Sequence, residues 1–86
     1  MLSGTQCAAA RALLRWKQAD LSEAIKQAGG RLSVTAITGF ERGGAIREST
    51  ASLIQSALEA AGVEFIPEHG GGAGVRLRER RAVDEM

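Results

Sequence analysis

Aromatic residues are scarce in this chain, where two phenylalanines and one tryptophan make up 3% of 86 residues and tyrosine is absent. The core must therefore be built from aliphatic side chains and alanine, and hydrophobic residues still account for 44% of the sequence. Such small side chains suit closely packed helices, so we expect a mainly helical protein. A chain of this length can bury one core of useful size, which predicts one compact body.

Cysteine and histidine occur once each, as Cys7 and His69. A single cysteine cannot form an internal disulfide, and this pair of residues cannot supply the ligands of a structural zinc ion. We therefore expect no metal and no cofactor. Cys7 is expected to be a small buried core residue, and His69, next to a run of glycines, a solvent-exposed loop residue.

Long hydrophobic runs are also missing, since no segment approaches the roughly 20 apolar residues of a membrane span. The first residues lack the basic and apolar segments of a signal peptide. These absences predict a cytoplasmic protein with no membrane partner. The sequence also contains no evident nucleophile, general-base pair or metal cluster, so we do not expect an enzyme.

Charge is distributed unevenly along the chain although its formal net charge is only +1. Residues 1 to 47 contain seven basic and three acidic side chains, a net charge of +4, and the remainder carries −3. A surface that binds phosphate groups would therefore belong mainly to the first half of the chain.

Apolar residues recur at helical spacing in four segments, which predict a small bundle of four to five helices. Ser33 is a suitable N-cap residue for the third segment, and paired glycines follow the second and the third. We expect helices at residues 5 to 16, 18 to 28, 34 to 42 and 48 to 61. This order of helices is compatible with a DNA-binding helix-turn-helix.

Two short segments after the last helix, residues 63 to 66 and 75 to 78, have the character of strands and predict a short C-terminal β-hairpin. The chain would then consist of a helical bundle at residues 1 to 62 and the hairpin at residues 63 to 78. The charged residues 79 to 86 lack an apolar period and are expected to form a flexible tail.

Three segments resemble the lambda-repressor-like, or XRE/Cro-type, helix-turn-helix family of transcriptional regulators. They read AARALLRWKQADL at 9 to 21, LSVTAITGFERG at 32 to 43 and ALEAAGVEFI at 57 to 66, and the GVRLR at 74 to 78 is similar to the tail of short family members. The resemblance implies a bacterial or phage regulator that binds double-stranded DNA at a palindromic operator.

The family's recognition helix corresponds to residues 33 to 42, in which Ile37 and Phe40 would anchor the helix to the core. Its outward side carries hydroxyl and methyl groups but no side chain suited to bidentate base contacts, so we expect modest direct readout supplemented by DNA shape. The resemblance implies that the base-facing residues are Val34, Thr35, Thr38 and Gly39.

The resemblance also implies contacts to DNA phosphates at the ends of the helices. Solvated surface and loop residues are the alternative explanation for the same side chains. The implied contacts come from Gln18, Arg31, Ser33, Arg42 and Arg47.

Arg11 and Glu41 occupy positions that commonly form a structural ion pair in this family, although two unrelated surface charges would give the same sequence. One departure from the family pattern concerns the stretch between Leu21 and Ile37, which is longer than usual. A wider turn would either leave the recognition helix in place or tilt it away from the groove.

A regulator of this size is expected to act as a homodimer, because two half-sites about 34 to 36 Å apart bind more tightly than one. The last helix and the hairpin are the candidate surfaces, through apolar side chains or a free strand edge. The hairpin candidates are Val63, Phe65, Val75 and Leu77. The alternative function is a protein-binding module on the same scaffold, such as an antitoxin or antiactivator whose partner is another regulatory protein.

Overall fold

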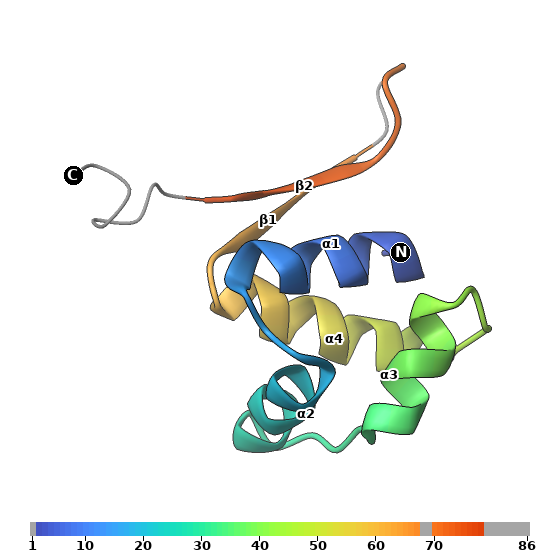
Figure 1. Cartoon of the computed structure of the whole chain (residues 1–86), viewed down its shortest axis with the longest axis vertical. Helices are drawn as coiled ribbons and strands as arrows, with labels where there is room; N and C mark the ends of the chain where they lie inside the picture. The colour runs from blue at the N-terminus through green and yellow to red at the C-terminus, as the bar shows by residue number, and fades with distance from the viewer. Residues whose placement is uncertain (1, 68–69, 79–86) are drawn as a thin grey trace.

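The computed structural model describes residues 2 to 67 and 70 to 78. The expected mainly helical fold with a C-terminal hairpin is confirmed, and the described residues form four helices and one two-stranded antiparallel sheet (Figure 1). His69 and the expected tail at residues 79 to 86 lie outside the described residues. The elements are α1 (Gly4–Leu14), α2 (Gln18–Gln27), α3 (Val34–Glu41), α4 (Glu48–Ala60), β1 (Val63–Ile66) and β2 (Gly74–Leu77).

Side-chain caps fix where two of the helices begin. The hydroxyl of Ser3 accepts the Gln6 N–H and the Gln6 side chain accepts the Ser3 N–H, which satisfies two amide groups at the start of α1. The Ser33 hydroxyl accepts the Ala36 N–H at 3.1 Å, so the predicted cap of α3 is confirmed.

The connection between α2 and α3 is a wide turn of residues 28 to 33. Gly29 has a φ of +95°, a conformation that glycine adopts without strain. The Gly30 N–H donates to the Ile25 carbonyl at 2.9 Å, and the Ser22 hydroxyl donates to the Leu32 carbonyl. These bonds tie the long connection to α2, so it has a defined path.

The core lies among all four helices and the hairpin. Figure 1 shows the hairpin on one side of α1 and α4, with α2 and α3 on the other side. Burying each large aliphatic side chain contributes about 1.5 to 3 kcal/mol. Cys7 is among the buried residues, as predicted. The largest fully buried side chains are Cys7, Leu21, Ile25, Ile37, Ile54, Leu58 and Val63.

The hairpin uses its apolar face within the chain. Val63 pairs with Leu77 and Phe65 pairs with Val75, so these four side chains share one face. Val63 is fully buried, and the other three pack against the core. Val63 is therefore engaged in the chain's own core, because a two-stranded hairpin needs an apolar face to attach itself to the helices, and the expected role of these residues in dimerisation stays a prediction.

In the described part of the chain, no helix combines the length and the hydrophobicity that crossing a bilayer requires.

Two helical glycines predict opposite effects on stability. A Cβ at Gly4 would lie 2.1 Å from the Phe40 carbonyl oxygen, whereas a Cβ at Gly39 would meet no atom within 4 Å. We expect Gly4→Ala to destabilise the fold by about 1 to 3 kcal/mol through overpacking. Gly39→Ala should stabilise it by about 0.5 to 1 kcal/mol, because alanine favours the helix.

Urea unfolding of both variants beside the unaltered chain measures these free energies. Equal effects of the same sign would contradict the close approach of α1 to the end of α3.

Candidate nucleic-acid interface

Helix α3 has an anchored side and an outward side. Ile37 is fully buried and Phe40 is 5% exposed, so both attach the helix to the core. Val34 is 41% exposed, Thr35 and Gly39 are also exposed, and Thr38 is half-buried. Since α3 lies on the far side of α1 from the hairpin (Figure 1), the hairpin does not cover its outward surface.

The Arg11–Glu41 ion pair is present and joins α1 to the end of α3. Arg11 Nε lies 2.7 Å from Glu41 Oε2 and Arg11 Nη2 lies 2.6 Å from Oε1, which is a bidentate arrangement. The remaining guanidinium nitrogen, Nη1, donates to the Trp16 carbonyl at 2.9 Å. Both side chains are largely shielded from solvent, so the pair fixes the relative position of the two helices.

Two further donors reach the same carboxylate. Cys7 Sγ donates to Glu41 Oε2 at 3.1 Å, and Gln18 Nε2 donates to Oε1 at 3.1 Å. Burial opposes ionisation of Glu41, but the hydrogen bonds from Arg11, Gln18 and Cys7 outweigh it and lower the pKa of its carboxyl. Glu41 is therefore a carboxylate at neutral pH.

The same contacts keep Cys7 and Arg11 in their ordinary charge states. Burial, together with the hydrogen bond to Glu41, raises the pKa of the Cys7 thiol to about 12. The hydrogen bond to Glu41 raises the pKa of the Arg11 guanidinium. Cys7 is therefore a neutral thiol at physiological pH, and it lacks the thiolate that a reactive cysteine needs.

The side chain of Gln18, the first residue of α2, joins α2 to α3, a role that the sequence did not indicate. Its Nε2 donates to Glu41, and its Oε1 accepts the Thr38 hydroxyl at 2.6 Å. The side-chain amide that the resemblance assigns to a DNA phosphate is thus engaged within the protein. The contacts span 20 and 23 positions of the chain, and no local pattern of residues indicates them.

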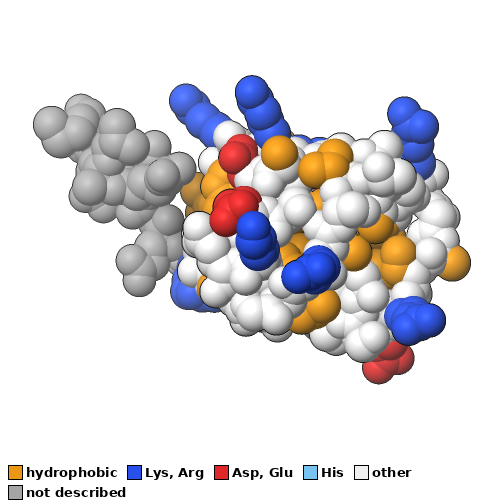
Figure 2. Space-filling view, turned by 90° about the horizontal axis from the view of Figure 1, so that it is seen from below, with side chains coloured by type: hydrophobic (Ala, Val, Ile, Leu, Met, Phe, Trp, Pro, Cys, Tyr) orange, Lys and Arg blue, Asp and Glu red, His pale blue; other side chains and the backbone are white. Residues whose placement is uncertain are grey.

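The arginines expected to contact phosphates are all exposed. Arg31 lies in the connection before α3, Arg42 directly follows α3, and Arg47 precedes α4. Ser33, the fourth candidate beside them, is exposed and uses its hydroxyl as the α3 cap. Figure 2 views the molecule from the side of α2 and α3, where Lys and Arg side chains lie both around the rim and near the middle of the face, with fewer acidic side chains among them.

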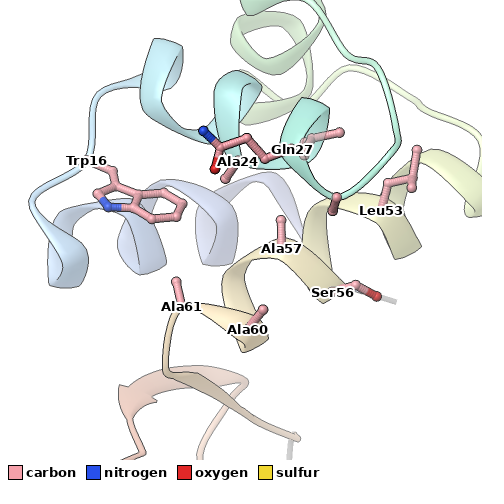
Figure 3. Close-up of a pocket in the computed structure, with 10 residues that line it drawn as sticks. Trp16, Ala24, Gln27, Leu53, Ser56, Ala57, Ala60 and Ala61 are labelled. Atoms are coloured by element: carbon pink, nitrogen blue, oxygen red, sulfur yellow. The ribbon is translucent and has the colours of Figure 1, made fainter.

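A hollow of about 540 Å³ between α2 and α4 was not expected from the sequence. Figure 3 shows the Trp16 ring at one end and Leu53 toward the other, with small side chains of both helices between them. None of its lining residues is titratable, so it offers apolar contact and no acid–base chemistry.

Within residues 2 to 67 and 70 to 78, no three His, Cys, Asp or Glu side chains come together in a way that could hold a metal ion. Comparison of the chain with protein-family models, curated proteins and solved structures found no match.

The pKa of Glu41 predicts how acid affects stability. Its carboxyl has a lower pKa in the folded chain than its ordinary value of 4.5, so its charge stabilises the fold above that pH. The contribution is lost as the pH falls through the folded pKa. We expect Glu41→Gln to cost about 3 to 5 kcal/mol at pH 7, because it breaks a shielded ion pair.

Thermal unfolding of both chains between pH 7 and about pH 3 tests this expectation. The difference between them should shrink as acid neutralises Glu41 in the unaltered chain. Glu23→Gln is the control, since Glu23 is exposed and accepts a hydrogen bond from the neighbouring Gln27. A Glu41→Gln effect that stays constant across this range would contradict the assignment.

Proposed function

We propose that this protein is a sequence-specific DNA-binding transcriptional regulator in which α2 and α3 form a helix-turn-helix and α3 enters the major groove. The observation that carries the proposal is the division of α3 into two sides. Ile37 and Phe40 are buried, while Val34, Thr35 and Gly39 are exposed.

The dimensions of α3 suit this role. Its eight residues give a rod about 12 Å long, and the major groove is about 12 Å wide. Small side chains on the outward surface allow the helix backbone to come close to base edges. The methyl groups of Val34 and Thr35 are suited to contact with thymine methyls.

Guanidinium groups at both ends of α3 support the proposal. Arg31 precedes the helix and Arg42 follows it, so both are positioned to contact the phosphates that border the groove. Arg47 extends this charge toward α4. Such contacts position the protein on the duplex, and sequence is read by the base-facing residues and by DNA shape.

We also propose that the protein acts as a homodimer on a palindromic operator, because a single α3 can read only one half-site. Val63 is fully buried, so the surface that the hairpin offers to a second copy comes from its other apolar residues. Phe65, Val75 and Leu77 are partly exposed at the hairpin, where a second copy could pair with a strand edge.

The proposal predicts DNA binding with a steep dependence on salt. We expect Arg31→Gln and Arg42→Gln each to weaken binding to all sequences and to make the slope of log K against log salt shallower by about 2, because each subunit of the proposed dimer loses one phosphate contact. The matched control is Arg76→Gln, because Arg76 pairs with Glu64 on the hairpin. Fluorescence anisotropy with duplexes selected from a random library measures each slope.

A second candidate is a protein-binding module on this scaffold, which the lack of Arg, Lys, Asn and Gln within α3 favours. The same titration separates the two functions. Failure to select any duplex, or binding that is indifferent to salt and to the charge of Arg31 and Arg42, would contradict the DNA-binding function.

A further inference from the structure

We propose that Thr38 reads its base as a hydrogen-bond acceptor only and therefore selects adenine or cytosine on the strand it faces. The inference rests on the proposed DNA-binding function and adds a specificity-determining residue to it. It follows from a chain of hydrogen bonds that begins at Glu41 and ends at the outward surface of α3.

The first step fixes the orientation of the Gln18 amide. An ionised carboxylate accepts hydrogen bonds and donates none. Arg11 donates to both oxygens of Glu41 and keeps the carboxylate ionised. The Gln18 atom that lies 3.1 Å from Glu41 Oε1 must therefore be the nitrogen of the NH₂ group. The order of nitrogen and oxygen in this amide is thus set by chemistry.

The second step fixes the proton of the Thr38 hydroxyl. With its NH₂ group facing Glu41, Gln18 turns its carbonyl oxygen toward Thr38 Oγ1 at a distance of 2.6 Å. A carbonyl oxygen only accepts, so the proton between the two atoms belongs to Thr38. Among the described residues no donor bonds to Thr38 Oγ1, and Thr38 is partly exposed, so the lone pairs of this oxygen are open to a partner outside the chain.

The third step concerns the bases. A free threonine hydroxyl can rotate to donate or accept, and it discriminates poorly between base edges. Held by Gln18, the Thr38 hydroxyl can only accept, so it matches the amino groups of adenine and cytosine in the major groove. When guanine or thymine occupies that position, the Thr38 oxygen faces an acceptor atom of the base. No proton lies between the two atoms, so no hydrogen bond forms.

Selection of duplexes from a random library by the full-length protein tests the inference. We expect adenine and cytosine to be enriched about threefold to tenfold at one position of each half-site, the range of a single hydrogen bond. Thr38→Val keeps the shape but lacks the oxygen, so it should lose this enrichment. Thr38→Ser keeps the hydroxyl and should retain it.

Gln18→Leu provides the sharper comparison. It removes the acceptor of the Thr38 proton and leaves the hydroxyl itself, so the position should broaden to include guanine and thymine. Thr5→Val is the matched control, because Thr5 is exposed on α1, outside the proposed DNA-contacting surface, and makes no side-chain hydrogen bond among the described residues. Thermal unfolding verifies that each variant is folded at the selection temperature.

The outcomes separate the inference from the function on which it rests. Identical base preferences for the unaltered chain and Thr38→Val would overturn the role of Thr38 and leave DNA binding in place. An unchanged preference in Gln18→Leu would overturn the control by Gln18. If the unaltered chain selects no sequence, both the inference and the proposed function are overturned.

Discussion

The position of α3 depends on the hydrogen bonds and the ion pair that the Glu41 carboxylate makes. Glu41 is the last residue of α3, and its carboxylate accepts hydrogen bonds from Cys7 and Arg11 of α1 and from Gln18 of α2. A shielded charge left without partners is costly, so the folded arrangement is stable only with all three helices in place around it. The energetic gain of such a pair over apolar packing is small in general, and what it supplies here is a single geometry.

Apolar packing and the polar cluster around Glu41 hold different parts of α3. Ile37 and Phe40 hold the buried side of α3, and the Gly4 backbone lies against the Phe40 carbonyl, where a larger residue would collide. The helix is therefore fixed by its inner side and its C-terminal end. The outward side of α3 takes no part in the core, so core packing does not dictate which residues stand there.

Local features of the fold could be predicted from the sequence, whereas contacts between distant residues could not. The apolar periods predicted all four helices within one or two residues, and Ser33 predicted the start of α3. The resemblance supplied the Arg11–Glu41 pair, but nothing indicated that Gln18 also bonds to it. The alternation of residues predicted the apolar face of the hairpin. That this face packs against the chain's own core depends on tertiary contacts, which periodicity does not encode.

Gly39 provides a separate argument about the outward side of α3. A glycine inside a helix costs about 0.5 to 1 kcal/mol relative to alanine, and at this position a Cβ would find open space. Neither packing nor backbone conformation within the chain requires glycine there, since its φ is not positive. Close approach of the backbone to a ligand is a further use of glycine. The cost that Gly39 imposes on the fold is thus explained if another molecule lies directly against α3.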